Sequence, residues 1–154
     1  MELTAGSAAP AFTLPGVAGR EISLAALTGR KVVVYFYPKD DTSGCTKEAQ
    51  EFDALRAAFA EAETEVIGIS PDGPASKAKF AKKYGLELAL AADEERSAVQ
   101  AYGVWAEKSM YGRRYMGVER TTFLIDREGT IARVWPKVKV PGHAAEVLAA
   151  ARAL

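Results

Sequence analysis

The single cysteine of this sequence, Cys45, lies where a thiol is easily activated. It follows an apolar run that ends at Pro38 and a polar turn that contains Thr42, and a helical pattern begins at the cysteine itself. Backbone N–H groups at the start of a helix have no partner within the helix and carry positive partial charge. Such a position stabilises the thiolate, which is the nucleophilic form of cysteine. The spacing therefore indicates thiolate chemistry.

A free cysteine is more often a small buried hydrophobic residue than a reactive group. The neighbours of Cys45 are polar, however, and Thr42 or Ser43 can cap the helix that follows. The carboxylates of Asp40 and Asp41 favour the helix dipole but oppose a nearby thiolate, and the sequence does not decide between these effects. The polar context favours a reactive thiol over a core residue.

Composition narrows the class of protein further. A length of 154 residues indicates one domain, 1–154, with a core large enough to need no disulfide or metal. Lys and Arg number 20 against 20 Asp and Glu, which gives no sign of a nucleic-acid or anionic-membrane partner. With one cysteine and one histidine, we expect no intrachain disulfide and no metal site. No signal peptide or membrane-spanning stretch is expected, and the expected location is cytoplasmic.

The elements that must position Cys45 alternate between strands and helices. Strands are expected at 12–14, 21–23, 31–37, 66–69, 86–91, 121–125 and 131–135, and helices at 45–62, 75–84, 94–102 and 141–153. The continuous apolar run at 31–37 is typical of a strand buried on both faces. Segment 105–117 is rich in glycine and aromatic residues and shows no clear pattern. This order predicts an α/β domain.

Pro38-x-x-x-Thr42-x-x-Cys45 matches the active-site signature of the peroxiredoxins, and YFYPKDDTSGCTKEA resembles the PrxQ, or bacterioferritin comigratory protein, subfamily. Three further segments are similar to that family in the same order: APAFTLPG, KSMYGRRYMGVERTTFLIDREG and GHAAEVL. The resemblance covers nearly the whole chain. It implies a thioredoxin-like fold with an N-terminal β-hairpin and a central mixed sheet flanked by helices. It also implies thiol-dependent reduction of hydrogen peroxide and organic hydroperoxides, with no cofactor.

The resemblance also implies the roles of five residues. Cys45 would be the peroxidatic cysteine, whose thiolate attacks the peroxide and becomes a sulfenic acid. Arg120 would stabilise the thiolate and the leaving oxygen, although by sequence alone it is one of many surface cations. Thr42 would hydrogen-bond the peroxide or the thiolate, and Pro38 would shield the thiol from water. Glu48 would orient Arg120, or else be a solvated helix carboxylate.

The sequence departs from the family pattern in two places. Ser43 stands where the family usually has proline, which is a mild change at a helix start. Many relatives carry a resolving cysteine five residues after the peroxidatic one, where this chain has Gln50, and others carry it in the next helix, near Ala81 and Lys82. A one-cysteine mechanism is therefore expected, in which an external thiol (thioredoxin, glutaredoxin or a glutathione-like molecule) reduces the sulfenic acid and over-oxidation is a risk.

Two other functions remain open. The chain could be a redox-inert or holdase-type binding domain that kept the thioredoxin fold. A thiol–disulfide oxidoreductase normally uses Cys-x-x-Cys, and Glu48 occupies the partner position here, which argues against that chemistry. The oligomeric state is expected to be a monomer or a weak dimer.

Four apolar residues and the single histidine carry weaker signals. His143 is expected to be structural. Trp105, Met110, Tyr111 and Met116 either line a pocket for apolar peroxides or form part of the core or surface.

Overall fold

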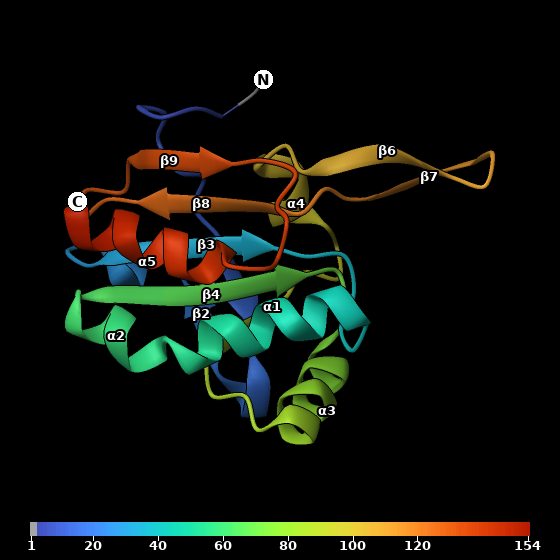
Figure 1. The fold of residues 1–154 in the computed structure, drawn as a ribbon, viewed down its shortest axis with the longest axis horizontal. Helices are drawn as coiled ribbons and strands as arrows, with labels where there is room; N and C mark the ends of the chain where they lie inside the picture. The colour runs from blue at the N-terminus through green and yellow to red at the C-terminus, as the bar shows by residue number, and fades with distance from the viewer. Residues whose placement is uncertain (1–2) are drawn as a thin grey trace.

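A five-stranded sheet with helices on both faces forms the centre of the fold in the computed structural model, which describes residues 3–154 (Figure 1). Residues 1 and 2 of the expected N-terminal segment lie outside the described part. The strands are β1 (Thr13–Pro15), β2 (Glu21–Ser23), β3 (Lys31–Phe36), β4 (Thr64–Ser70), β5 (Ala89–Ala92), β6 (Trp105–Met110), β7 (Arg113–Val118), β8 (Thr121–Ile125) and β9 (Ile131–Trp135). The helices are α1 (Ser43–Ala54), α2 (Arg56–Glu61), α3 (Pro74–Tyr84), α4 (Ser97–Ala101) and α5 (His143–Ala153).

Strand β3 occupies the middle of the sheet, whose order is β5-β4-β3-β8-β9. It runs parallel to β4 and antiparallel to β8, so the sheet is mixed, as expected. The apolar run predicted to be buried on both faces is buried along its whole length. Because side chains alternate across a strand, Val33 and Tyr35 join one hydrophobic core and Val34 and Phe36 join the other.

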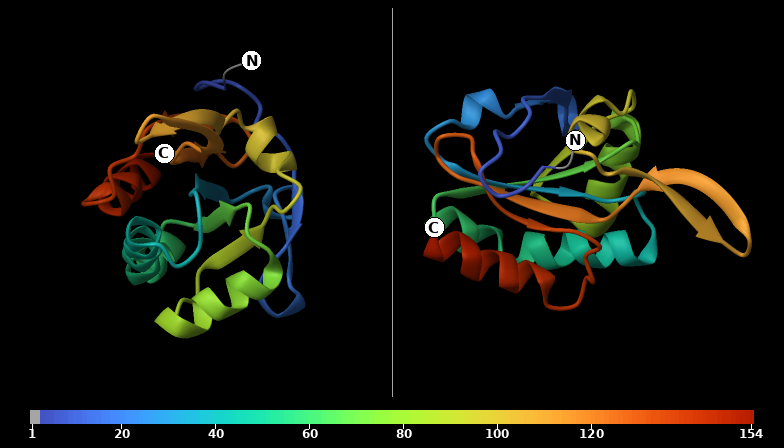
Figure 2. Two further views of the ribbon diagram at one scale, coloured as in Figure 1. Left: turned by 90° about the vertical axis from the view of Figure 1, so that its right-hand side faces the viewer. Right: turned by 90° about the horizontal axis from the view of Figure 1, so that it is seen from above.

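The two cores lie on opposite faces of the sheet. Helices α1, α2 and α5 cover one face, and the β1–β2 hairpin with α4 lies over the other (Figure 2). The predicted N-terminal hairpin is confirmed by the antiparallel pairing of β1 with β2. In the core beneath α1, the fully buried ring of Phe52 stacks on Tyr35 with centroids 4.6 Å apart. This stacking fixes the height and rotation of α1, and therefore the position of its first turn.

The single helix expected at 45–62 is divided into α1 and α2. Leu55, between them, has φ −97° and ψ 6°, which interrupts the regular helix. Just before the break, the carboxylate of Asp53 accepts hydrogen bonds from the backbone N–H groups of Glu87 and Leu88 at 2.8 and 2.9 Å. The same bonds explain why β5 begins only at Ala89, since two amides of the expected strand are already bound to Asp53.

The helix expected at 94–102 is shorter than predicted. Arg96 has φ +61°, and residues 93–96 form a turn closed by a hydrogen bond from its N–H to the carbonyl of Asp93. The Asp93 carboxylate accepts the N–H of Val99 at 2.8 Å, which anchors the first turn of α4. Side-chain capping of this kind competes with helix formation at the preceding residues.

The segment without a clear pattern, 105–117, forms most of the β6–β7 hairpin, which projects from the body of the molecule (Figure 1). Its two-residue turn, Tyr111 and Gly112, has φ of +53° and +77°. Two successive positive φ angles are the requirement of the tight turns that suit the twist of paired strands. Gly112, at the second position of this turn, is the feature of the sequence that indicates a hairpin here. Among residues 3–154, no helix is both long and apolar enough to cross a membrane.

Candidate active site

Strand β3 and helix α1 place Cys45 beyond the carboxyl end of the central strand. The chain leaves β3, makes a polar turn at 37–42 and enters α1 at Ser43, so Cys45 lies in the first helical turn. The first N–H bonded back along the helix is that of Thr46, to the carbonyl of Thr42 at 2.8 Å, so the amides before it keep their positive partial charge. Cys45 is 2% exposed, which limits the access of water to the sulfur.

Arg120 reaches Cys45 from the neighbouring strand. It immediately precedes β8, whose residue Thr121 pairs with Phe36 at the end of β3. The guanidinium Nη2 donates a hydrogen bond to the Cys45 sulfur at 3.4 Å. A Cβ atom on Gly44 would lie 3.3 Å from the same nitrogen, so the lack of a side chain there leaves room for the guanidinium. A fixed cation thus faces the sulfur.

Glu48 holds the other side of the guanidinium. It lies one helical turn after Cys45 and is 1% exposed, so the solvated-carboxylate alternative is wrong. Its Oε1 accepts a hydrogen bond from Arg120 Nη1 at 2.6 Å, and Oε2 has no partner among the described residues. Burial raises the pKa of Glu48 to about 7, while the charge of Arg120 acts in the opposite direction. The pair fixes the guanidinium in one orientation.

The buried carboxyl of Glu48 makes the stability depend on pH. Its folded pKa of about 7 exceeds the ordinary 4.5, so the folded state binds more protons between these values. The contribution of Glu48 to stability is therefore fully present below about pH 4.5 and is lost as the pH rises toward 7, by on the order of 3 kcal/mol. Urea unfolding of the parent and Glu48→Gln at about pH 5 and about pH 8 measures this effect.

We expect the unfolding free energy of the parent to fall more across that interval than that of the Glu48→Gln variant. The comparison removes contributions from groups that titrate in both proteins, such as His143, whose pKa is lowered by burial. Equal pH dependence in the two proteins would contradict the role of Glu48.

Thr42 and Pro38 lie in the turn between β3 and α1 that leads to Cys45. Thr42 is exposed at the N-cap position of α1, but its side chain makes no capping bond, contrary to expectation. Its hydroxyl instead donates to the carbonyl of Lys39 at 2.9 Å, which leaves the oxygen lone pairs able to accept. Pro38 is half-buried directly after β3.

The two aspartates before the cysteine have separate cationic partners. Asp40 is buried and pairs with Lys77 at 2.9 Å, and Asp41 is exposed and pairs with Lys83 at 2.8 Å. Each carboxylate is therefore largely compensated by its own lysine, which reduces its opposition to a thiolate on Cys45.

The residues with weaker signals have packing roles or lie exposed on the β6–β7 hairpin. His143 Nε2 lies 2.8 Å from the Thr122 hydroxyl, and its ring packs edge-on against Phe52. On the β6–β7 hairpin, Met110, Tyr111 and Met116 are exposed. In the β6–β7 register Met110 lies opposite Arg113 and Met116 opposite Glu107, so the two methionines point to opposite faces of the hairpin and do not line one pocket.

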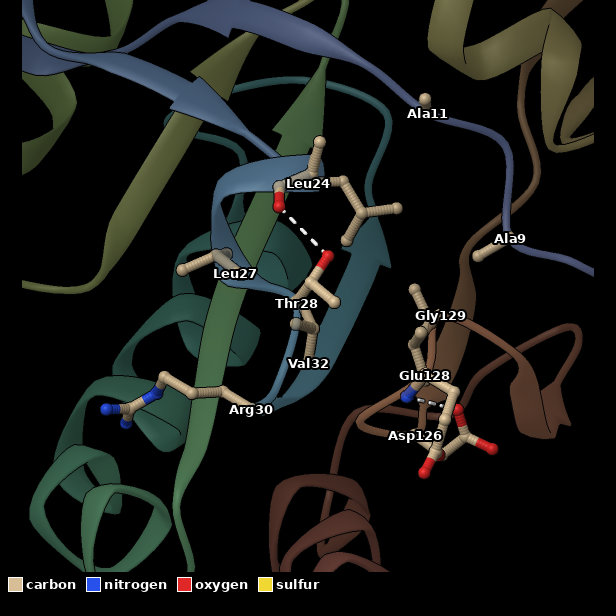
Figure 3. A pocket seen from close by; sticks show the side chains of 12 residues that line it. Ala9, Ala11, Leu24, Leu27, Thr28, Arg30, Val32, Asp126, Glu128 and Gly129 are labelled. Atoms are coloured by element: carbon tan, nitrogen blue, oxygen red, sulfur yellow. Dashed lines mark hydrogen bonds between the residues drawn. The ribbon is translucent and has the colours of Figure 1, made fainter.

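A pocket at the opposite end of β3 is separate from this site. Figure 3 shows it between the N-terminal segment, the loop at Leu27 and Thr28, and the β8–β9 turn at Asp126 and Glu128. Its lining residue Val32 lies near the start of β3, whereas Cys45 follows the end of that strand. None of the residues that line it belongs to the arrangement around Cys45.

Comparison with known proteins decides the family. The profile of the AhpC/TSA family matches residues 5–134. The chain belongs to this family. A putative peroxiredoxin Bcp of Coxiella burnetii is 49% identical over 148 residues, which cover 96% of this chain and 98% of the relative. Peroxiredoxin Bcp of Bacillus subtilis is 43% identical, with coverage of 96% and 94%.

Solved structures agree with this assignment to the peroxiredoxins. A mutant of Xylella fastidiosa PrxQ superposes with a TM-score of 0.94 at 34% identity and covers 99% of this chain and 98% of its own. Xanthomonas campestris peroxiredoxin Q gives 0.88 at 42% identity, with coverage of 92% and 90%. The expected thioredoxin-like fold and PrxQ resemblance are confirmed. Peroxiredoxins of this type are thiol-dependent peroxidases, and so is this chain.

Sequence reasoning missed one group of residues beside the active site of this peroxiredoxin. Lys77 is fully buried in α3 and donates hydrogen bonds to Tyr37 and Asp40, which both lie in the turn that leads to α1. In the sequence it is one of four lysines between Lys77 and Lys83, and nothing marks it as the buried one. Only the packing of α3 on the sheet distinguishes it.

Proposed function

We propose that this peroxiredoxin reduces hydrogen peroxide and organic hydroperoxides by a one-cysteine cycle. The Cys45 thiolate attacks one peroxide oxygen, the O–O bond breaks, and the second oxygen leaves with a proton as water or an alcohol. Cys45 becomes a sulfenic acid. An external thiol attacks this sulfur to give a mixed disulfide and water, and a second thiol releases Cys45 and takes away the disulfide.

The contact between Arg120 Nη2 and Cys45 Sγ, at 3.4 Å, is the observation that carries this proposal. A permanent cation beside the sulfur stabilises the thiolate before the reaction and the negative charge on the leaving oxygen during it. Glu48 accepts from the other nitrogen and keeps the guanidinium aimed at the sulfur. Because the donors are already oriented, little reorganisation is needed when charge develops.

The remaining two residues have supporting roles in the proposal. Thr42 would accept a hydrogen bond from the peroxide O–H, since its own proton is committed to Lys39. Pro38 would exclude water from the approach to the sulfur. A Xanthomonas campestris bacterioferritin comigratory protein described as having alkyl peroxide reduction activity is 41% identical, which supports organic hydroperoxides as substrates.

The external thiol follows from the position of the sequence departures. Gln50 lies exposed on α1, and Ala81 and Lys82 lie on α3. None of them can form a disulfide, and Cys45 is the single cysteine. The sulfenic acid must therefore meet a thiol from another molecule. A glutathione-like molecule, glutaredoxin and thioredoxin are the candidates.

Intact mass after one equivalent of hydrogen peroxide tests the cycle. The expected result is a gain of one oxygen atom, lost again when excess glutathione or reduced thioredoxin is added. With limiting thiol, the mixed disulfide on Cys45 should be observed. An unchanged mass after peroxide would refute the peroxidase step, and a disulfide-linked dimer as the main product would refute reduction by an external thiol.

A further inference from the structure

A buried polar cluster lies next to the active site and takes no part in the chemistry described above. We call it the Lys77 cluster, and its members are Tyr37, Asp40, Ser70, Ser76 and Lys77. The ammonium of Lys77 is 0% exposed and donates to Asp40 Oδ1 at 2.9 Å, to the Tyr37 hydroxyl at 2.9 Å and to the Ser70 hydroxyl. Every proton of the ammonium is therefore satisfied.

The Lys77 cluster ties the turn before α1 to a distant part of the chain. Asp40 lies in that turn, and its Oδ2 accepts from Ser76 of α3 at 2.8 Å. Its backbone N–H donates to Asp72 of the β4–α3 loop, also at 2.8 Å. Tyr37 donates to Asp40 Oδ1 at 2.5 Å and so closes the turn upon itself. The side chain of Asp40 is therefore hydrogen-bonded to α3, and its backbone is hydrogen-bonded to the loop that precedes α3.

Burial makes these bonds different from ordinary surface pairs. Burial lowers the pKa of Lys77, while the charge of Asp40 acts in the opposite direction. A buried pair that loses one partner leaves an uncompensated charge, whereas exposed pairs contribute little. The pair between Lys83 and Asp41 joins the same helix to the same turn, but it is exposed. The chain thus contains a natural comparison between the two cases.

We propose that Lys77 is a positioning residue for peroxide cleavage, which fixes the turn so that the Cys45 sulfur meets the Arg120 guanidinium. This inference rests on the proposed function. Cys45 lies five residues after Asp40, so movement of the turn changes the position of the sulfur directly. Misplacement of a reacting atom by about 1 Å can cost 100-fold in rate. Lys77 does this without contacting the reacting atoms.

Lys77→Met tests the inference, with Lys83→Met as the matched control. Rapid-mixing measurement of Cys45 oxidation by hydrogen peroxide should show a rate constant roughly 10- to 100-fold lower for Lys77→Met. The control should stay within about twofold of the parent, because its pair is exposed. Equal rates in parent and Lys77→Met would overturn the proposal.

The double variant Asp40→Asn/Lys77→Met separates positioning from stability. It removes both charges, so its unfolding free energy should recover relative to Lys77→Met. It still lacks the three ammonium hydrogen bonds, so its oxidation rate should stay at least about fivefold below that of the parent. Recovery of rate together with stability would show a structural role only and overturn the proposal.

Amide hydrogen exchange gives a readout that needs no peroxidase activity. In Lys77→Met the amides of residues 40–46 should exchange faster than in the parent, while those of β8 stay unchanged. Unchanged exchange at residues 40–46 would overturn the inference by itself. If the parent thiol does not react with peroxide, the proposed function fails, and the exchange result still shows whether Lys77 holds the turn.

Discussion

Replacing Cys45 by serine should abolish thiol-dependent peroxide consumption. A serine hydroxyl is not ionised near neutral pH, so it cannot replace the thiolate as a nucleophile. The rate should fall to that of the reducing thiol reacting with peroxide on its own. Peroxide consumption is measured with purified parent and Cys45→Ser at equal concentration, with glutathione or reduced thioredoxin in excess.

Because serine is nearly isosteric with cysteine, the fold should persist in this variant. Thermal unfolding by circular dichroism provides the control, and Cys45→Ala gives a second variant without any polar atom at the position. Peroxide consumption by a folded Cys45→Ser variant at the parent rate would end the peroxidase proposal. If the parent and Cys45→Ser then suppress the aggregation of an unfolded client protein equally well, the holdase alternative is favoured.

Arg120→Ala should slow the oxidation of Cys45 by roughly 100- to 1000-fold. Removing one preoriented donor to a developing oxyanion typically costs this much in other enzymes. The guanidinium also faces the sulfur at 3.4 Å in the resting state, so its loss weakens the thiolate as well. The measurement is the second-order rate constant for peroxide, from the dependence of the oxidation rate on peroxide concentration.

Stability must be measured alongside, since Arg120→Ala leaves the buried carboxylate of Glu48 without its partner. Arg120→Lys keeps the positive charge. A lysine ammonium lacks the planar guanidinium that donates to Glu48 and Cys45 through two separate nitrogens, so an intermediate rate is expected. Arg114→Ala is the matched control, because Arg114 is exposed and its pair with Glu107 measures 3.5 Å. Equal rates for Arg120→Ala and Arg114→Ala would remove Arg120 from the mechanism.

Together these experiments assign separate roles to three cations, Arg120, Lys77 and Lys83. Arg120 contacts the sulfur, Lys77 positions the turn that carries it, and Lys83 lies on the surface. The expected order of effects on the oxidation rate is Arg120 first, Lys77 second and Lys83 last. Burial and distance to the reacting atom decide this order.

The buried central strand, the family and a helix beginning close to Cys45 were all predictable from the sequence, although α1 begins two residues earlier than expected, at Ser43. Apolar runs and helical periodicity are local signals, because they depend on residues a few positions apart. The predicted starts of β5 and α4 were less accurate, because aspartate side chains bind backbone N–H groups there. Asp53 accepts from two N–H groups just before β5, and Asp93 accepts from one N–H in the first turn of α4. Hydrogen bonds from backbone N–H groups to aspartate side chains are not visible in patterns of apolar residues.

Which charged residues act together depends on contacts between segments far apart in the sequence. Arg120 lies 75 positions after Cys45, and the antiparallel pairing of β3 with β8 brings the two within 3.4 Å. The resemblance had singled out Arg120, but its contact with the sulfur and the burial of Glu48 required coordinates. Lys77 had no signal at all, because its charge matters only once α3 packs over the turn and excludes water. The strength of a charge depends on the solvent removed around it, and that removal is a property of the folded chain.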